Sequence, residues 1–169
     1  MLKQLIAGGA DVHKAPGVIE KAVNRESIES IQILVEAGAD VNGDPEDYYR
    51  PLFTAVRDNL PEYMSKLLSL GANPNIISGQ GSPFLLAASQ EDPTRLKIML
   101  DGGADVNLAQ NGVTALMRAS DNNLVGNVKL LMEKGANPNV VDERGRTAME
   151  IASEKGYDDL VMLLLDTMS

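Results

Sequence analysis

Few residues of this chain have the types and spacing that catalysis or metal binding would need. The chain has one histidine, His13, and no cysteine, so a zinc or other transition-metal site is not expected. Serine-based catalysis needs a histidine or lysine base within reach. The segment 78–82, Ser-Gly-Gln-Gly-Ser, looks like a phosphate-binding loop, but it lacks the lysine and the preceding strand of one. We therefore predict no catalytic residue and no cofactor.

The aspartates are better explained by turn structure. Asp40, Asp105 and Asp142 lie one by one in separate turn-rich segments and not as a pair that could share acid and base roles. Aspartate side chains accept hydrogen bonds from backbone N–H groups two residues further on. We expect that role for these three, and we interpret His13 as a turn residue.

Composition excludes several partner classes. The 15 basic and 24 acidic residues give a net charge of -9, whereas a nucleic-acid binder needs a basic face. No apolar run is long enough to span a membrane, and the N-terminus does not read as a secretion signal. We expect no nucleic acid and no membrane as partners. With no cysteine, we also expect an intracellular protein in the cytoplasm, with the nucleus left open.

A short motif recurs through the chain and sets its architecture. Gly-Ala-Asp-Val-Asn at 38–42 returns with small changes at 71–75, 103–107 and 135–139, and a variant opens the chain at 9–13. Successive motif glycines are 29, 33, 32 and 32 residues apart. Self-similarity at this period is typical of repeat proteins.

Each repeat predicts two helices. Counting 21 residues back from each motif glycine gives Gly17, Arg50, Ser82 and Thr114, and the same register reaches Thr147. A first short helix should follow each of these positions. The second helix has apolar residues at i, i+3 and i+4, which make one buried stripe. These stripes are Ile31/Leu34/Val35, Met64/Leu67/Leu68, Leu96/Met99/Leu100, Val128/Leu131/Met132 and Val161/Leu164/Leu165.

The helix ends carry suitable residues. Pro61 and Pro93 fit the first turn of the second helix, and Ser27 and Asp92 fit its N-cap. A left-handed residue is expected where the first helix ends, at Asn59, Asn123 and Gly156, and again at each motif glycine. One such unit cannot cover its own apolar stripe, so the units must stack.

These residues resemble the ankyrin repeat, whose pattern is a Gly-rich turn, Thr-Pro-Leu-His, an alanine pair, a Leu-Leu helix and Gly-Ala-Asp-x-Asn. The resemblance covers the whole chain. It implies an all-α fold: an ankyrin-repeat α-solenoid of stacked helix–loop–helix units with β-hairpin fingers. The expected single domain, 1–169, has a half repeat at 1–13 and repeats at 17–45, 50–77, 82–109, 114–142 and 147–169.

The chain departs from the family pattern in two ways. The family histidine is absent, with Glu20, Phe53, Leu85, Met117 and Glu150 in its place, so its hydrogen bonds to the capping threonine should be lost. Gly17 and Arg50 also replace that threonine. The half repeat leaves Leu2, Leu5 and Ile6 without a covering helix, the first finger should be stunted, and the last repeat reads as a natural end.

Family members usually bind partners on a concave side formed by finger tips and first-helix ends. By resemblance, the partner-binding residues here are Glu46, Asp47, Tyr48, Tyr49, Arg57, Asp58, Gln80, Ser89, Gln90, Asn111, Val113, Asp121, Asn122, Arg144 and Arg146. Tyr48 and Tyr49 stand out because tyrosine is enriched at binding hot spots. Beside acidic residues they suggest a partner with basic and apolar character, although one ring could instead pack on the next repeat.

The leading hypothesis is therefore a non-catalytic protein–protein interaction module, a monomer or one that associates weakly through its N-terminal end. One alternative is a structural segment that stacks through the uncovered N-terminal helix. Another is the ankyrin domain of a larger protein whose activity lies outside this chain. By resemblance to related repeats, Asn42 and Asn107 are also possible hydroxylation substrates.

Overall fold

The computed structural model describes residues 4, 6, 8, 9, 11, 12, 17–25, 27–43 and 50–167. Its contacts divide the chain into two compact units, Met1–Pro83 and Phe84–Ser169, called unit 1 and unit 2. We describe each unit by itself. The expected domain and repeat boundaries remain predictions.

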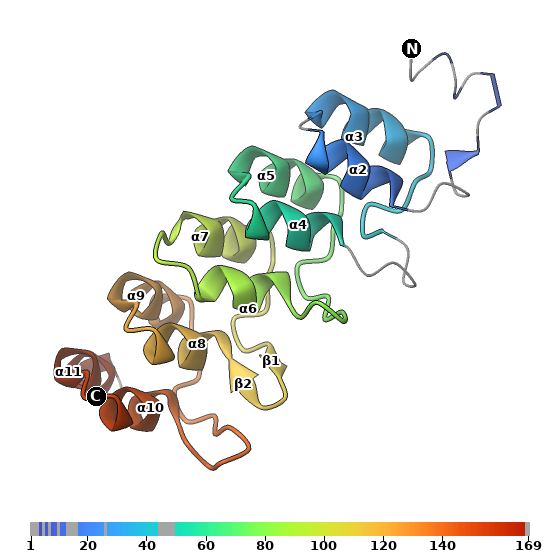
Figure 1. Ribbon diagram of the computed structural model, residues 1–169. Coiled ribbons are helices and arrows are strands. Elements are labelled where there is room, and N and C mark those ends of the chain that lie inside the picture. The colour runs from blue at the N-terminus through green and yellow to red at the C-terminus, as the bar shows by residue number, and fades with distance from the viewer. Residues whose placement is uncertain are drawn as a thin grey trace. The chain divides into compact units, whose positions relative to one another are not determined.

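Unit 1 contains two complete helix pairs (Figure 1). The first helix of each pair contacts its second helix, and the neighbouring pairs contact one another through α2 with α4 and α3 with α5. A bridge between Ser78 and Gly81 closes a hairpin after the second pair. The helices are α2 (Val18–Asn24), α3 (Ile28–Glu36), α4 (Pro51–Arg57) and α5 (Pro61–Ser69).

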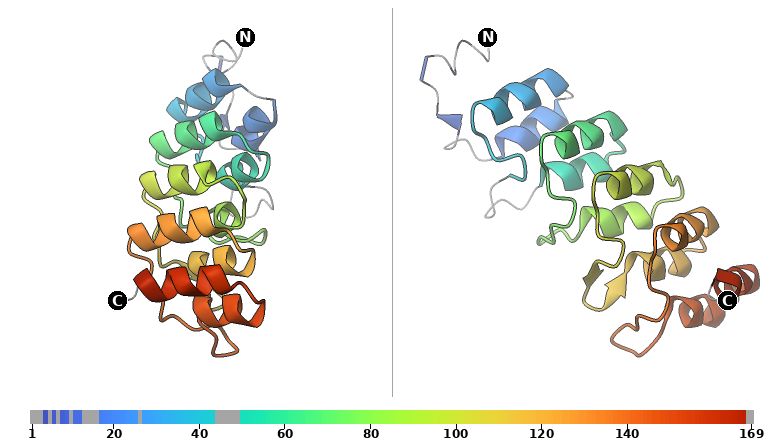
Figure 2. Two further views of the ribbon diagram at one scale, coloured as in Figure 1. Left: turned by 90° about the vertical axis from the view of Figure 1, so that its left-hand side faces the viewer. Right: turned by 180° about the vertical axis from the view of Figure 1, so that it is seen from behind.

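Unit 2 repeats the arrangement, and Figure 2 shows its second helices side by side. Strands β1 and β2 pair antiparallel, with Ala109 opposite Thr114 and Gln110 opposite Val113. The elements are α6 (Pro83–Ala88), α7 (Thr94–Asp101), β1 (Ala109–Gln110), β2 (Val113–Thr114), α8 (Ala115–Asp121), α9 (Val125–Glu133), α10 (Ala148–Glu154) and α11 (Asp158–Thr167). Within the described ranges, no helix is long and apolar enough to cross a bilayer.

The predicted apolar stripes form the core of both units. Met64 and Leu67 of α5 and Leu96 and Met99 of α7 are fully buried. The stripe of α11 was predicted wrongly at one position, because Leu165 is 43% exposed and Leu160 is buried in its place. Leu160 and Leu164 of α11 are fully buried in the core, whereas Leu165 is exposed.

The helix ends agree with the sequence in most places. Asn59 and Asn123 have φ of 56° and 54°, which confirms the left-handed end of the first helix. The motif glycines have φ between 86° and 96°. Ser27 caps α3 by accepting the Ser30 N–H. Asp92 accepts the N–H of Thr94, but it lies one residue before the N-cap position, which is Pro93.

Asparagine and aspartate side chains order the turns and join neighbouring repeats. Asp40 accepts the Asn42 N–H at 2.9 Å, and Asp105 accepts that of Asn107 at 2.9 Å, as predicted. The side-chain oxygen of Asn42 then accepts the N–H of Asn73 in the next repeat at 2.8 Å. The side-chain oxygen of Asn107 likewise accepts the N–H of Asn137 at 2.7 Å. Asn42 and Asn107 therefore each link their repeat to the following one.

In the last repeat, Glu150 stands where the family histidine would be and itself forms hydrogen bonds with the capping threonine. Thr147 accepts the N–H of Glu150, and the Glu150 carboxylate accepts the N–H of Thr147, so the two form a capping box. Arg50 makes no side-chain cap, but its guanidinium donates to the carbonyl oxygens of Asn42 at 3.1 Å and Gly43 at 3.0 Å. It holds the turn that precedes its own repeat.

The fold class is therefore confirmed. Within each unit, helix pairs stack through apolar stripes, and hairpins project between one pair and the next. The stunted first finger and the uncovered residues Leu2 and Leu5 lie outside the described residues.

Candidate protein-binding surface

The predicted partner-binding residues lie on hairpin fingers and first-helix ends. In unit 1 they are Arg57, Asp58 and Gln80, and in unit 2 Ser89, Gln90, Asn111, Val113, Asp121, Asn122, Arg144 and Arg146. We call these two sets the finger surface of unit 1 and of unit 2. The predicted Glu46, Asp47, Tyr48 and Tyr49 lie outside the described residues, as does His13.

In unit 1, Arg57 and Asp58 are exposed at the end of α4 and pair with each other. The Arg57 guanidinium donates to both Asp58 oxygens, at 2.7 and 2.8 Å. This hydrogen bonding lowers the pKa of Asp58. Gln80 lies in the finger, where its side-chain oxygen accepts the N–H of Arg50 at 3.3 Å. Gln80 therefore holds its finger against the start of α4.

The end of α6 is tied down by hydrogen bonds. Ser89 donates its hydroxyl to the carbonyl of Leu85, and the Gln90 amide donates to the carbonyl of Leu86. The side-chain amide of Asn127 reaches from α9 and donates to the carbonyls of Ala88 at 3.0 Å and Gln90 at 2.7 Å. Ser89 and Gln90 are half-buried, so they present less to a partner than their sequence position suggests.

The β1–β2 finger ends in a two-residue turn. Asn111 and Gly112 have φ of 52° and 73°, which suits the tight turn of a twisted hairpin. The side chain of Asn111 is exposed and has no partner among the described residues, whereas Val113 is half-buried in β2. A Cβ at Gly112 would lie 3.4 Å from the backbone nitrogen of Glu143. The two fingers of unit 2 therefore touch side by side.

Arg146 fixes the second finger of unit 2 to α10. Its guanidinium donates to one Asp142 oxygen at 3.0 and 2.8 Å and to Glu154 at 2.7 Å. Backbone N–H groups of Arg144 and Arg146 donate to the other Asp142 oxygen. Hydrogen bonds from Arg146 lower the pKa of Asp142, and the same pairing raises the pKa of Arg146.

Arg144, at the tip of that finger, differs from Arg146. Its side chain is exposed and has no partner within the described part of the chain. Asp121 and Asn122 lie at the exposed end of α8. Asp121 pairs with Lys155 at 2.8 Å, and the Asn122 amide donates to the carbonyl of Arg118 at 2.8 Å. Hence Asn111 and Arg144 are the most available groups of the finger surface of unit 2.

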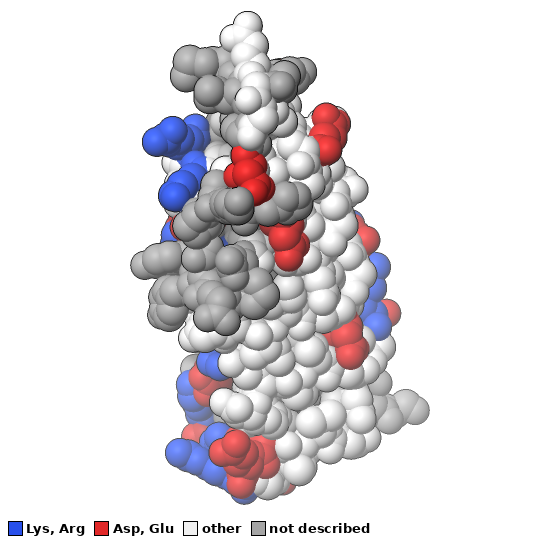
Figure 3. All heavy atoms as spheres, turned by 90° about the vertical axis from the view of Figure 1, so that its right-hand side faces the viewer, with Lys and Arg blue, Asp and Glu red and all other residues white. Residues whose placement is uncertain are grey.

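The described part of this arrangement offers polar groups that can recognise another molecule. Among the described residues, no cluster of three metal-binding side chains occurs. On the visible face in Figure 3, acidic and basic side chains are interspersed, and Lys and Arg form no continuous basic field. The polar groups are spread along finger tips and helix ends, which suits an extended contact with a protein surface.

Sequence reasoning missed the structural roles of Arg146, Arg50 and Asn127. The i, i+4 spacing of Asp142 and Arg146 was a visible signal for their ion pair. The partners of Arg50 lie seven and eight residues away, and those of Asn127 at 37 and 39 residues, so only the folded chain brings them together.

The chain is similar to proteins from several kingdoms. It is 36% identical over 115 residues to "Putative E3 ubiquitin-protein ligase XBAT34" of Arabidopsis thaliana, covering 65% of this chain and 31% of that protein. It is 26% identical to "Putative ankyrin repeat protein YahD" of Escherichia coli K12, over 97% of this chain and 88% of that protein. It is 38% identical to ankyrin repeat and SOCS box protein 6 of Homo sapiens, over 68% of this chain and 30% of that protein.

The chain thus spans less than a third of the length of the Arabidopsis and human relatives, and most of the length of the bacterial one. The family model described as ankyrin repeats (3 copies) matches residues 83–169, about half of the chain. Motif, helix pairs, fingers and this match agree, so the chain belongs to the ankyrin-repeat family, whose repeats are in general non-catalytic protein–protein interaction modules.

Proposed function

We propose that this chain binds a protein partner through its finger surface, without catalysing a reaction. The observation that carries the proposal is the pair of unpartnered polar side chains, Asn111 and Arg144, on adjoining fingers of unit 2. Hydrogen bonds hold the backbones beneath them, at Asp142 and at the β1–β2 pair. A partner would therefore meet ordered groups, which reduces the entropy cost of binding.

The finger surface of unit 1 would offer the Arg57–Asp58 pair as a contact of its own. The residues Glu46, Asp47, Tyr48 and Tyr49 stay part of the proposal as the anchor for a partner of basic and apolar character. Replacing both tyrosines by alanine should weaken binding while the melting temperature stays nearly constant.

A pull-down with matched variants tests the proposal. The purified chain, Arg144→Glu and Lys134→Glu would be presented to native lysate, and bound proteins quantified. Both variants reverse one charge, but Lys134 lies at the end of α9, a helix that carries no predicted partner-binding residue, in a weak pair with Asp101 at 3.6 Å. Partners should be lost with Arg144→Glu and kept with Lys134→Glu. Equal capture by all three proteins would contradict the finger surface.

Two other functions remain as alternatives. In the first, the chain assembles with a second copy or another domain through its N-terminal end. Light scattering over a range of concentrations distinguishes this, because self-association makes the measured mass rise with concentration.

In the second alternative, the chain is the ankyrin domain of a larger protein. Its similarity to a third of a ubiquitin ligase and of a SOCS box protein supports it. An intracellular, cytoplasmic location also stays a proposal, which imaging of a fluorescent fusion would test.

A further inference from the structure

The pair Asn111–Gly112, at the tip of the β1–β2 finger, has a chemistry of its own. In an Asn–Gly pair the backbone nitrogen of the glycine can attack the side-chain carbonyl carbon of the asparagine, because no Cβ shields that nitrogen. A bond forms between this nitrogen and Cγ, the bond from Cγ to Nδ2 breaks, and ammonia leaves. Water then opens the cyclic imide and leaves aspartate or isoaspartate. The reaction therefore needs water but no enzyme and no oxidant.

The chain has two such pairs in different surroundings. One is Asn111–Gly112 in unit 2, and the other is Asn42–Gly43 in unit 1. Both glycines have a positive φ, 73° at Gly112 and 76° at Gly43, so the glycine φ does not distinguish the pairs. The difference lies in the hydrogen bonds that hold the reacting groups.

The Asn42–Gly43 pair is held at both reacting groups. The nitrogen of Gly43 donates to the backbone carbonyl oxygen of Asp40 at 3.0 Å. The side-chain oxygen of Asn42 accepts the N–H of Asn73 at 2.8 Å, and its amide nitrogen donates to the Asp40 carboxylate at 3.3 Å. The Arg50 guanidinium also donates to the backbone carbonyl oxygens of both residues. Bringing the Gly43 nitrogen to Cγ of Asn42 would break several of these bonds at once.

The Asn111–Gly112 pair is not held in this way. The side chain of Asn111 is exposed, and neither it nor the Gly112 N–H forms a hydrogen bond among the described residues. Each strand of the finger beneath is two residues long (Figure 1). The attack requires the turn to open so that the nitrogen reaches Cγ, and so short a hairpin opens locally at little cost. We therefore expect much faster attack here than at Asn42.

The position of Asn111 gives the reaction a consequence for the finger surface of unit 2. A Cβ at Gly112 would lie 3.4 Å from the backbone nitrogen of Glu143, so the finger adjoins the one that carries Arg144. Deamidation would remove the N–H donors of the Asn111 amide and leave a carboxylate, which only accepts hydrogen bonds. It would also add a negative charge to a chain whose net charge is already -9.

We propose that Asn111 is a site of spontaneous deamidation in the folded protein, whereas Asn42 is protected. This modification follows from the surroundings of the two pairs alone. Its effect on binding rests on the proposed function. A partner group that meets Arg144 must be an acceptor, because a guanidinium only donates. A carboxylate on the adjoining finger would compete with that group, so the converted protein would bind its partner less tightly.

Peptide mapping by mass spectrometry tests the modification without a partner. The purified chain would be incubated at neutral pH, and the aspartate and isoaspartate formed from Asn111 and from Asn42 would be followed in the same sample. In the folded chain, Asn111 should convert at least about tenfold faster than Asn42. In urea, which removes the hydrogen bonds that protect Asn42, the two rates should approach each other.

Asn111→Gly is the matched variant for the charge. Glycine also accepts the left-handed conformation of this turn, and it has no amide to lose. Isoelectric focusing of the incubated wild type should show a growing acidic species, and the incubated Asn111→Gly protein should lack it.

A pull-down from native lysate tests the effect on binding. Asn111→Asp and Asn111→Gly both lack the amide, and only the first carries the carboxylate. Asn111→Asp should therefore capture less of each partner than Asn111→Gly does. Thermal melts of both variants would show whether each is folded, because aspartate and glycine both tolerate a left-handed backbone.

The outcomes separate this inference from the proposed function. Equal conversion of Asn111 and Asn42 in the folded chain would overturn the modification, and so would an Asn111 that does not react. Fast conversion of Asn111 together with equal capture by the two variants would confirm the modification and overturn its effect on binding. If no variant captured a partner, the proposed function would fail, and the two conversion rates would still decide the modification.

Discussion

The first helices of the helix pairs begin differently in the two units, although they occupy the same repeat positions. In unit 2, Thr114 and Thr147 cap α8 and α10 through their hydroxyls. In unit 1, α2 follows Gly17, which is in the left-handed conformation, and α4 follows Arg50, and neither residue makes a side-chain cap. The family match covers 83–169, nearly the same range as unit 2. Family-like sequence therefore coincides with family-like capping.

The comparison teaches that the repeat depends on buried stripes more than on one set of caps. Both units bury the same stripe positions, Met64 and Leu67 in one and Val128 and Leu131 in the other. Where the threonine is missing, Arg50 orders the adjoining turn through two backbone carbonyls. A capping bond contributes about 1 kcal/mol, whereas a buried leucine contributes several times more.

The largest expected effect comes from emptying equivalent core positions. Leu67→Ala and Leu131→Ala each remove a fully buried side chain at the same repeat position. Each should lower the free energy of unfolding by about 2–5 kcal/mol, measured by urea denaturation with circular dichroism. Leu165→Ala, at a side chain that is 43% exposed, should cost much less. Clearly unequal losses at Leu67 and Leu131 would show that the two units are packed differently.

A smaller effect is expected at the left-handed residues Asn59 and Asn123. Replacing either one by alanine should cost about 1–2 kcal/mol, because a Cβ disfavours this backbone conformation and alanine lacks the compensating amide. Glycine at the same positions should retain most of the stability. Thermal melts of the four single variants measure this. If glycine were as harmful as alanine, the asparagine side chain and not the backbone would be responsible.

The smallest effect is expected at the capping box of Thr147 and Glu150, which distinguishes the last repeat from the other described repeats. Thr147→Ala should cost about 1 kcal/mol at neutral pH. The Thr147 N–H lowers the folded-state pKa of Glu150, so its stabilisation is present above the unfolded pKa and is lost as pH falls through the folded one. The stability difference between wild type and Glu150→Ala should therefore shrink in acid.

Thr114→Ala is the control for that titration, because the third residue of α8 is Met117, which has no carboxyl group. Its cost should be similar at neutral pH and nearly constant with pH. Denaturant midpoints of wild type, Glu150→Ala and Thr114→Ala at several pH values measure these differences. If the stability loss of Thr114→Ala shrank in acid as much as that of Glu150→Ala, Glu150 would not be the titrating group.

Much of the fold was predictable because the signals repeat. The interval of 21 residues placed every pair of helices, and Asn59, Asn123 and the motif glycines marked where the helices end. The role of Asp40 and Asp105 also followed from local chemistry. The error at Leu165 arose because periodicity identifies an apolar face but does not say what lies against it.

The candidate surface was less predictable, since availability depends on distant partners. Arg144 and Arg146 look alike in the sequence, yet Arg146 is held by Asp142 and Glu154 while Arg144 is not. Gln80, Ser89 and Gln90 also turned out to bond to backbone groups of the fold.

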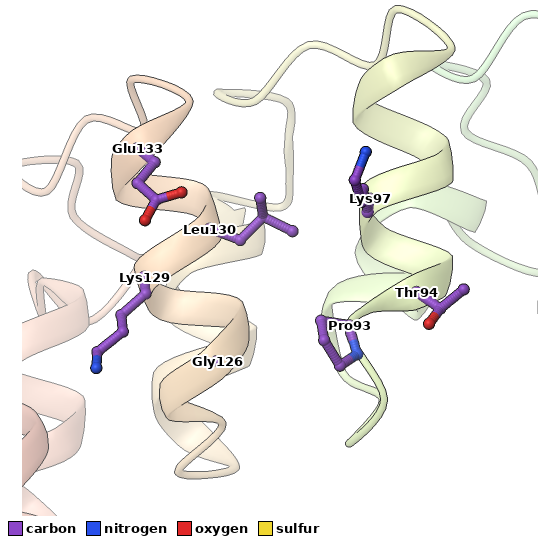
Figure 4. A pocket seen from close by; sticks show the side chains of 7 residues that line it. All are labelled: Pro93, Thr94, Lys97, Gly126, Lys129, Leu130 and Glu133. Atoms are coloured by element: carbon purple, nitrogen blue, oxygen red, sulfur yellow. The ribbon is translucent and has the colours of Figure 1, made fainter.

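By itself, the sequence determined the repeat, its register and the family, because helix periodicity and left-handed turns are local properties that recur at a fixed spacing. Only the tertiary structure decided which polar groups remain available and where a groove opens. The sequence shows Gly126 only as a glycine in a predicted helix. In the folded chain it lines a pocket of about 300 Å³ between α7 and α9, together with Leu130 and Pro93 (Figure 4). Such features depend on what packs against each side chain, which residue spacing within one repeat does not specify.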